Sequence, residues 1–475
     1  MLLRPVPLGV TLPNSGQMIR LLMLLVGSFV SVAVSSAQSL DGVWRSRGYG
    51  DVFRIQGRDL REFQVTSKTC VAGFIARRLA TPDREAAFKI AEGGVLLIKS
   101  GHNDDHKLLH FDFSDCDIRI DRLPQMPTLC DPPTADTPRD NYEVFTRTFA
   151  ENYISFDLKQ TNWDKVVADN RARVTSTTTP AQLFDILEAM IKPFGDIHTG
   201  IDAPQLKRQF EGIRPGTDRI LNGQTEEEFR KSDMRKLLAA IDRAWLKDPV
   251  RNFCNDQIQY GHIDNVTGYL RIVSFSSYSR HGGIAQGLMA LESALDAIFS
   301  DPALRALVID VRINFGGSDQ YGLAVASRLA TSEYLAFSIQ ARADPVDRNK
   351  WTEGYPVMVR PSPRPGFKGP VVELIGPYTL SAGETFTQAL MGRTPQITRI
   401  GENTQGVFSD VLERRLPNRW SFGLPNEVYR TSEGAAFDGL GIPPDIAVPV
   451  FADDDVAGGR DPAIGKALEL LKDGK

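Results

Sequence analysis

The most reactive group that the sequence offers is a serine at the expected junction of a strand and a helix. Residues 371–375 form a strand-like run, and Ser381 follows it shortly before a helix-like stretch that begins at Glu384. A hydroxyl at a helix N-terminus lies in a positive field, and the Ala382 N–H could stabilise an oxyanion beside it. Ser-x-x-Glu is also the pattern of a capping box, in which Ser381 would only accept a helical N–H. The local pattern leaves both interpretations open.

A serine nucleophile needs a base, and the histidines restrict the choice. All six precede Ser381 in the chain: His102, His106, His110, His198, His262 and His281. This order excludes an α/β-hydrolase, in which the histidine follows the nucleophile. No lysine occurs between Ser381 and Lys466, so a Ser–Lys pair with a nearby lysine is not expected either. His198, on a loop after a Pro-terminated helix, is the favoured base, with a purely structural histidine as the alternative. His281 is a weaker candidate.

A glycine turn follows another expected strand, residues 306–311. Gly316 and Gly317 could present backbone N–H groups to a ligand, or they could simply form a tight turn. The turn lacks the lysine and the glycine spacing of a nucleotide site. Three acids could orient the base, namely Asp438, Glu402 and Asp410. A metal cluster of His102, His106 and His110 is disfavoured, because their segment looks like a hairpin. Neither a metal nor an organic cofactor is expected.

Three kinds of segment would position these groups. Residues 40–131 contain short β-like runs separated by Gly and Asp turns. Residues 141–245 have helical periodicity, and Thr179-Pro180-Ala181-Gln182 has the cap, proline and glutamine of a helix start. Strands and helices then alternate, which predicts an α/β fold with a mostly parallel sheet. Ligands of such sheets bind at the carboxyl ends of the strands, where the Ser381 turn is expected.

The N-terminus has the features of an export signal. Residues 1–37 contain no Asp or Glu, and Arg20 precedes a short apolar run that ends at small residues. This combination predicts a secretory signal peptide, with an uncleaved anchor as the alternative, and an exported protein in the periplasm or outside the cell. Export would allow the four cysteines to pair, and Cys116 with Cys130 is the first expectation, from sequence proximity alone.

The composition is that of an ordinary globular protein, with 42% hydrophobic and 24% charged residues over 475 positions. It excludes a mainly disordered, collagen-like or coiled-coil chain. The formal net charge of −4 argues against nucleic acid as a partner, since such proteins carry a strongly basic face.

Five ordered segments together resemble the tail-specific or C-terminal processing serine peptidases, whose relatives include the tricorn core protease and interphotoreceptor retinoid-binding protein. The segments are Phe-Gly-Asp-Ile-His-Thr-Gly (194–200), Val-Ile-Asp-Val-Arg (308–312) with Gly-Gly (316–317), Ser-Ala-Gly-Glu (381–384), Gly-Glu-Asn-Thr-Gln-Gly (401–406) and Gly-Leu-Gly-Ile-Pro-Pro-Asp-Ile (439–446). The resemblance implies a crotonase-like ββα-type catalytic core with a mostly parallel sheet, preceded by a helical domain. The β-rich residues 40–131 fall outside it.

The resemblance also implies roles for single residues. Ser381 would be the nucleophile, and Ala382 with Gly316 or Gly317 would supply the N–H groups that bind the oxyanion. The processing-protease branch places a lysine after the nucleophile, but Val407 stands at the position where that lysine is expected.

The tricorn-like branch instead uses a histidine from the Asp-x-His segment, which His198 matches. It also uses an acid before the terminal segment, where Asp438 stands. No PDZ-like insertion is evident between residues 200 and 268, because that span is short and mostly charged helix.

These features together predict an exported serine peptidase that cleaves peptide or protein substrates through an acyl-enzyme, with no stable membrane span after signal removal. The alternatives are a non-catalytic ligand-binding protein on the same fold and an esterase-type acyl hydrolase. The expected segments are a signal peptide (1–37), a small β-rich N-terminal domain (38–132), a helical domain (139–248), an α/β serine peptidase core (249–450) and a C-terminal helix or tail (451–475).

Overall fold

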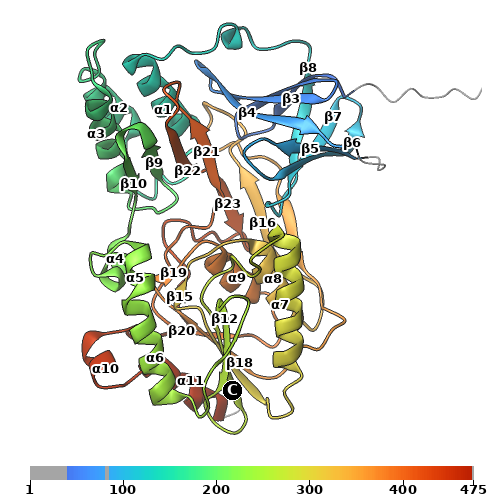
Figure 1. Ribbon diagram of the computed structural model, residues 1–475, viewed down its shortest axis with the longest axis vertical. Helices are drawn as coiled ribbons and strands as arrows, with labels where there is room; N and C mark the ends of the chain where they lie inside the picture. The colour runs from blue at the N-terminus through green and yellow to red at the C-terminus, as the bar shows by residue number, and fades with distance from the viewer. Residues whose placement is uncertain (1–39, 81–84, 473–475) are drawn as a thin grey trace, which may run out of the picture. The chain divides into compact units, whose positions relative to one another are not determined.

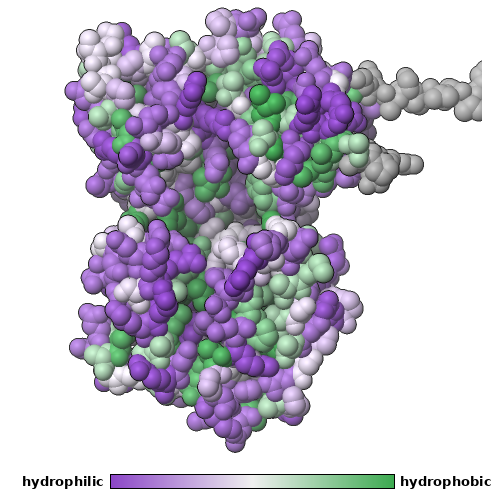
Figure 2. Space-filling view, in the orientation of Figure 1, coloured by the Kyte–Doolittle hydropathy of each residue, from purple (hydrophilic) through white to green (hydrophobic). Residues whose placement is uncertain are grey.

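The computed structural model describes residues 40–80 and 85–472 (Figure 1). The predicted signal peptide, residues 1–37, lies outside the described residues. Within the described ranges, no helix is both long and apolar enough to cross a membrane. On the face drawn in Figure 2, hydrophilic residues predominate and hydrophobic residues form small separate patches.

The first eight strands form a closed antiparallel barrel, in which each strand pairs with the next and the last pairs with the first. They are β1 (Gly42–Ser46), β2 (Asp51–Gln56), β3 (Asp59–Val65), β4 (Cys70–Arg78), β5 (Ala86–Ile90), β6 (Val95–Asn103), β7 (His106–Phe111) and β8 (Ile118–Leu123). Side chains alternate between the two faces of each strand, and Trp44, Phe53, Phe88 and Ile120 pack together in the interior. The β-rich character predicted for this part of the chain is confirmed.

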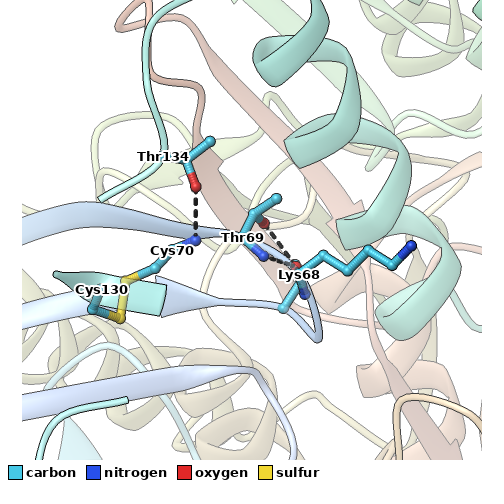
Figure 3. The surroundings of a disulfide bond; sticks show 6 residues. Lys68, Thr69, Cys70, Cys130 and Thr134 are labelled. Atoms are coloured by element: carbon cyan, nitrogen blue, oxygen red, sulfur yellow. Dashed lines mark hydrogen bonds between the residues drawn. A yellow bond between two sulfur atoms is a disulfide. The ribbon is translucent and has the colours of Figure 1, made fainter. Parts of the chain in front are cut away.

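A disulfide joins Cys70 in β4 to Cys130 in the short helix η1 (Thr128–Cys130), and their Cα atoms lie 5.1 Å apart (Figure 3). The expected pairing of Cys116 with Cys130 is therefore wrong. Cys116 is buried elsewhere, with its Sγ 3.9 Å from Glu427 Oε1. Thr134 Oγ1 accepts the N–H of Cys70, so the chain after Cys130 lies against β4 (Figure 3). Sequence proximity failed as a guide because the fold returns the end of the barrel segment to an early strand.

The segment predicted to be helical begins with three helices that pack around Phe145, Phe149 and Leu187. Thr179 and Gln182 make both hydrogen bonds of the capping box at the start of the third helix, as predicted. Residues 200–211, expected to be part of the helical segment, form two antiparallel strands instead. The elements in order are α1 (Pro138–Asn152), α2 (Trp163–Arg171), α3 (Pro180–Ile191), η2 (Lys192–Phe194), β9 (Gly200–Ala203), η3 (Pro204–Leu206), β10 (Arg208–Glu211), α4 (Pro215–Leu221), α5 (Glu226–Lys231) and α6 (Asp233–Trp245).

Strands from much later in the chain complete the β9–β10 sheet. Strand β9 pairs with β22 (Ser421–Pro425), which pairs in turn with β21 (Val411–Arg415) (Figure 1). Phe422 packs against Phe145 of α1, with ring centroids 5.0 Å apart. Because β9 begins two residues after His198, this pairing holds the loop that carries His198.

The core sheet has seven strands in the order β11-β12-β13-β14-β18-β20-β24. They are β11 (Arg251–Phe253), β12 (Ile258–His262), β13 (Thr267–Ile272), β14 (Ala306–Asp310), β18 (Val371–Ile375), β20 (Thr398–Gly401) and β24 (Ile446–Ala447). Neighbours from β13 to β24 are parallel, as the alternation of elements predicted, whereas β11 and β12 are antiparallel additions.

Helices cover both faces of this sheet, which explains why its central strands are mostly apolar. Leu307 and Ile309 of β14 face one apolar cluster, and Val308 between them faces the other. The first cluster includes α7 (Gly283–Phe299), α8 (Asp319–Leu329) and α9 (Ala382–Leu390), and the second includes α6 and α11 (Pro462–Lys472). The short helix α10 (Asp453–Ala457) precedes α11.

Two smaller sheets lie beside the core sheet. Strands β15 (Ile313–Asn314) and β19 (Tyr378–Thr379) form a short parallel pair, which brings the glycine turn next to the serine turn. Strand β16 (Tyr334–Ala341) lies between β17 (Tyr355–Val359) and β23 (Glu427–Arg430).

Candidate active site

Ser381 occupies a strained turn between β19 and α9. Its backbone angles are φ 49° and ψ −117°, a region that non-glycine residues rarely adopt and that costs about 1–3 kcal/mol. Its carbonyl oxygen accepts the N–H groups of Glu384 and Thr385 at 2.7 and 3.0 Å. Its hydroxyl makes no capping hydrogen bond. The turn therefore presents the hydroxyl without using it to cap the helix.

Glu384 completes no capping box either, because its carboxylate is bound elsewhere. It accepts hydrogen bonds from Thr404 Oγ1 at 2.5 Å, Gly406 N at 2.6 Å and Val407 N at 2.7 Å. The side chain is fully buried, and this burial raises its pKa to about 7. Glu384 thus fastens the chain around residue 406 to the first turn of α9, one helical turn from Ser381.

The glycine turn packs directly on Ser381. A Cβ at Gly316 would lie 2.8 Å from Ser381 Cβ and 3.4 Å from Ala382 N. The N–H of Gly316 donates to Asn314 Oδ1 at 2.9 Å, so it is not free to bind an oxyanion. Within residues 40–80 and 85–472, the N–H groups of Gly317 and Ala382 make no hydrogen bond. Of the three N–H groups expected from the sequence to bind an oxyanion, the two of Gly317 and Ala382 are therefore available for this role.

His198 lies on the loop that links η2 to β9. Its backbone N–H donates to Asp196 Oδ1 at 2.9 Å, and Asp196 is itself buried. Burial lowers the pKa of His198, while the charge of Asp196 and a hydrogen bond with the Ser409 backbone act in the opposite direction. Its Nδ1 is closed off from solvent and has no partner within the described residues. The ring is therefore neutral at neutral pH and able to accept a proton.

His198 and Ser381 are not hydrogen-bonded to each other within the described part of the chain. They are connected through the segment 404–409. Its Gly406 and Val407 are bound by Glu384, near Ser381, and its Ser409 contacts His198. One short stretch of chain thus joins the surroundings of the two residues.

Asp438 is buried beside the same segment. Its Oδ1 accepts the N–H of Phe408 at 3.2 Å, and its Oδ2 has no partner among the described residues. Burial raises the pKa of Asp438 to about 8, and the negative charges of Glu384 and Asp196 add to the effect. In the described ranges no hydrogen bond links Asp438 to His198. The acid that interacts with His198 in this structure is Asp196, which sequence reasoning did not single out.

The two other acids proposed to orient the base serve different contacts. Glu402 pairs with Arg219 at 2.9 Å and accepts the N–H of Val450. Asp410 belongs to a group of four crowded carboxyl groups: Asp115, Asp319, Asp410 and Glu427.

The pKa values of these four carboxyl groups are higher than those of exposed acids. Burial is the first cause, and it raises the pKa of Asp410 to about 6. The charge of Asp410 adds to burial at Asp115 and Glu427, whose pKa values rise to about 7 and about 8. The pKa of Asp319 is also raised, and its Oδ1 accepts a hydrogen bond from Thr385. No local motif joins these residues, which come from the barrel, α8, β23 and the loop before β21.

The remaining histidines lie elsewhere. His106 and His110 belong to a hairpin strand, as expected, and pair with Asp121 at 2.5 Å and Asp117 at 2.9 Å. His262 pairs with Asp301. His281, the weaker candidate for the base, is exposed. Among the described residues, no group of three or more His, Cys, Asp or Glu side chains could hold a metal ion.

Two family models match the chain. The model of peptidase family S41 matches residues 266–448, which include the glycine turn, Ser381 and Asp438. The model of the tricorn protease C1 domain matches residues 134–192, the segment of α1 to α3. A search of curated proteins found no match.

Solved structures share the fold. A putative peptidase from Parabacteroides merdae is 26% identical, with a TM-score of 0.57, and the alignment covers 71% of this chain and 97% of that one. Mature CPAF, solved in complex with lactacystin, is 13% identical with a TM-score of 0.50, over 71% of this chain and 97% of the other. The second likeness concerns the fold alone.

Proposed function

We propose that this chain, a serine-type peptidase that carries the domain of peptidase family S41, uses Ser381 as its nucleophile and His198 as its general base. The observation that carries the proposal is the backbone of Ser381. A residue held at φ 49° with its hydroxyl unused by the helix is strained without a structural benefit. Such a turn presents the hydroxyl at the positive end of α9, as a nucleophile requires.

The reaction follows from the groups around Ser381. His198 takes the hydroxyl proton as Ser381 Oγ attacks a peptide carbonyl, and the open N–H groups of Ala382 and Gly317 bind the oxyanion that forms. His198 then gives the proton to the leaving amine, and water hydrolyses the acyl-enzyme with His198 again as base. The lowered pKa of His198 supports its role as a base, since the ring is neutral before the reaction.

The approach of His198 to Ser381 is part of the proposal. The hydrogen bond between them would form in the substrate complex, where catalytic contacts commonly tighten. Segment 404–409 is suited to carry this movement, because it touches the surroundings of both residues. Asp438 would orient His198 or bind substrate once the two approach each other.

A fluorophosphonate probe tests the nucleophile. We expect covalent labelling of the wild-type chain and none of Ser381→Ala, while His198→Ala labels at a strongly reduced rate. Ser293→Ala is the matched control, because Ser293 is an exposed serine of α7 that only bonds to its own helix. Labelling that persists in Ser381→Ala would refute the assignment. Comparison of peptide and ester substrates separates a peptidase from an esterase, and absence of labelling in the wild type would favour a binding protein.

Export is the second part of the proposal. The sequence of residues 1–37 supports it, and so does the disulfide between Cys70 and Cys130, a bond typical of oxidising compartments. We expect the mature protein to begin near Gln38 in a cell fraction outside the cytoplasm. N-terminal sequencing of the fractionated protein tests this, and an intact N-terminus in the cytoplasm would contradict it.

A further inference from the structure

Ser274 is a fully buried serine whose hydroxyl lies behind the glycine turn. It stands two residues after the end of β13, and its Oγ donates to Gly316 O at 3.0 Å. That carbonyl already accepts the N–H of Phe275 at 2.7 Å. A buried hydroxyl costs free energy unless it is hydrogen-bonded, and an apolar side chain would avoid this cost beside a carbonyl that has a donor. A serine at this position therefore indicates a role beyond packing.

A second hydroxyl extends the contact outward. Ser276 Oγ lies 2.8 Å from Ser274 Oγ, and the side chain of Ser276 is half-buried. Because the one hydroxyl proton of Ser274 is used on Gly316 O, Ser276 is the donor to Ser274. The two serines thus form a directed chain of hydrogen bonds that ends on the Gly316 carbonyl.

The Gly316 carbonyl belongs to the same peptide unit as the Gly317 N–H. The bond between the two residues is trans, so these groups lie in one plane and point in opposite directions. A carbonyl that is held by two donors therefore fixes the direction of the Gly317 N–H. This N–H is one of the two that are proposed to bind the oxyanion.

The Gly317 N–H points to the side on which Ser381 lies. Residues 313–317 run between two other stretches of chain. On one side they exchange backbone hydrogen bonds with residues 273–275, and the bond to the Gly316 carbonyl is one of these. On the other side β15 pairs with β19, which ends two residues before Ser381 (Figure 1). Since the Gly316 carbonyl faces residues 273–275, the Gly317 N–H faces the serine turn.

We propose that Ser274 is a positioning residue for oxyanion binding and that Ser276 supports it. The inference rests on the proposed function, because it acts through the Gly317 N–H. Donation from the Ser274 hydroxyl polarises the peptide unit, and a polarised peptide has a stronger N–H donor. The same contact prevents the peptide plane from turning over, a change that two adjacent glycines would otherwise permit. A donor that is aligned in advance need not reorganise as the negative charge develops.

This role is separate from that of the base. In the ranges that the structure describes, no hydrogen bond links His198 to Ser274 or to Ser276. Removal of the Ser274 hydroxyl should therefore slow the step in which the oxyanion forms. It should not change the pH at which His198 titrates, nor the binding of substrate before the reaction.

The rate of labelling by a fluorophosphonate probe tests the inference, because the phosphoryl oxygen of the probe takes the place of the oxyanion. We expect the second-order rate constant to fall about 10-fold in Ser274→Ala, less than for loss of a whole donor, since the Gly317 N–H remains. The acid limb of the pH profile should stay at its wild-type pH. Ser46→Ala is the matched control and should label at the wild-type rate: Ser46 is a buried serine of the barrel that donates to Gly48 O at 2.7 Å.

A fluorogenic peptide that the wild type cleaves supplies the second readout. Ser274→Ala should lower kcat about 10-fold and change KM by less than about 2-fold, because the contact strengthens binding of the transition state alone. Equal labelling rates in wild type and Ser274→Ala, or a raised KM with kcat unchanged, would overturn the inference and leave Ser381 as the proposed nucleophile. Absence of labelling in the wild type would instead refute the proposed function, and the inference with it.

Ser276→Ala decides if Ser274→Ala fails to fold. The half-buried Ser276 is easier to replace, and its loss leaves the Ser274 hydroxyl in place but less polarised. We expect a fall of about 3-fold in kcat and in the labelling rate, with KM unchanged. Wild-type kinetics of Ser276→Ala would then refute the chain of hydrogen bonds as a positioning device.

Discussion

Glu384 Oε2 accepts the backbone N–H of Val407 at 2.7 Å. Val407 stands where the processing-protease pattern expects a lysine. At this position the chain therefore offers Glu384 a backbone N–H and no basic side chain. The side chain of Val407 is apolar and buried, and only its backbone takes part in a polar contact. A base supplied from that position is not available, which leaves His198 as the base that the proposed mechanism uses.

Glu384→Gln should weaken the anchoring of the chain around residue 406. Glutamine has one acceptor oxygen for three donors, and its NH₂ group would face an N–H. We expect a loss of about 1–3 kcal/mol in the free energy of unfolding, measured in urea, and reduced peptidase activity. Glu469→Gln, at an exposed ion pair with Lys466, should change stability by less than about 0.5 kcal/mol. Equal losses in both variants would contradict the anchoring role.

Gly316→Ala should inactivate the enzyme by pushing on Ser381. Gly316 has φ +68°, and its added Cβ would lie 2.8 Å from Ser381 Cβ. A displacement of the proposed nucleophile on this scale should lower kcat/KM by about 100-fold. Gly57→Ala is the matched control, because Gly57 has a similar φ of +59° but open space around it. Both variants share the backbone strain, so only Gly316→Ala should lose activity. Similar kcat/KM values for the two would mean that the contact with Ser381 is unimportant.

The acid limb of the pH–rate profile should reflect His198. Burial lowers its pKa below the usual value of about 6.5, so kcat/KM should stay high at neutral pH and decline only below that value. The same shift affects stability: a buried neutral histidine favours the folded state above pH 6.5, and this contribution is lost as the pH falls. A profile measured from pH 4.5 to 8 checks the prediction, with His198→Ala as the reference. A limb above pH 7 would assign the base to another group.

The crowded carboxyl groups should make the protein less stable as the pH rises. The pKa of Glu427 is raised to about 8 in the fold, so folding favours its protonated form. Its contribution is fully present below the ordinary carboxyl pKa of about 4.3 and declines as the pH rises toward 8. Glu427→Gln keeps an acceptor for the Tyr49 hydroxyl but cannot ionise.

We therefore expect the urea midpoint of Glu427→Gln to exceed that of the wild type at pH 8, and the two to converge at pH 4.5. Glu413→Gln, at an exposed position of β21, supplies the control with no such pH-dependent difference. A wild-type minus variant difference that is constant between pH 4.5 and 8 would show that Glu427 does not titrate in this range.

Loss of the disulfide should destabilise the barrel end of the chain. Cys70 and Cys130 are 60 positions apart, and a cross-link over such a loop contributes about 2–4 kcal/mol. Cys70→Ser should lower the unfolding free energy by about this amount under oxidising conditions. Cys254→Ser, at a free and half-buried cysteine, should have a smaller effect. A reducing agent should remove the difference between wild type and Cys70→Ser, and a difference that survives reduction would argue against the bond as its cause.

The local sequence predicted some elements well because their causes are local. Thr179 and Gln182 cap α3 as their spacing indicates. Ser381 and Glu384 have the equivalent pattern, yet no capping box forms there. The difference arises from residues 404–407, which offer Glu384 three donors from a distant part of the chain. No pattern within one helix could reveal that competition.

The parts of the site that depend on long-range pairing were not predictable from the sequence. The alternation of apolar strands and helices indicated the parallel core, but residues 200–211 form a short pair of strands whose further partner, β22, lies more than two hundred positions later. The crowding of Asp115 and Glu427 around Asp319 likewise joins distant parts of the chain, whereas the hydrogen bond from the His198 N–H to Asp196 is local. Residue types identified Ser381 and His198 as candidates, whereas their hydrogen-bond partners required the fold.

The pairing of β9 with β22 also has a consequence for how the protein is made. A ribosome delivers residues 200–203 more than two hundred positions before residues 421–425, so the nascent chain must wait for its closing strand. Until then β9, which follows the loop with His198, has only β10 beside it, even though Ser381 has already been synthesised. A chain interrupted before residue 421 would contain both residues in an unfinished scaffold. The order of synthesis thus delays completion of the sheet beside the His198 loop until almost the whole polypeptide exists.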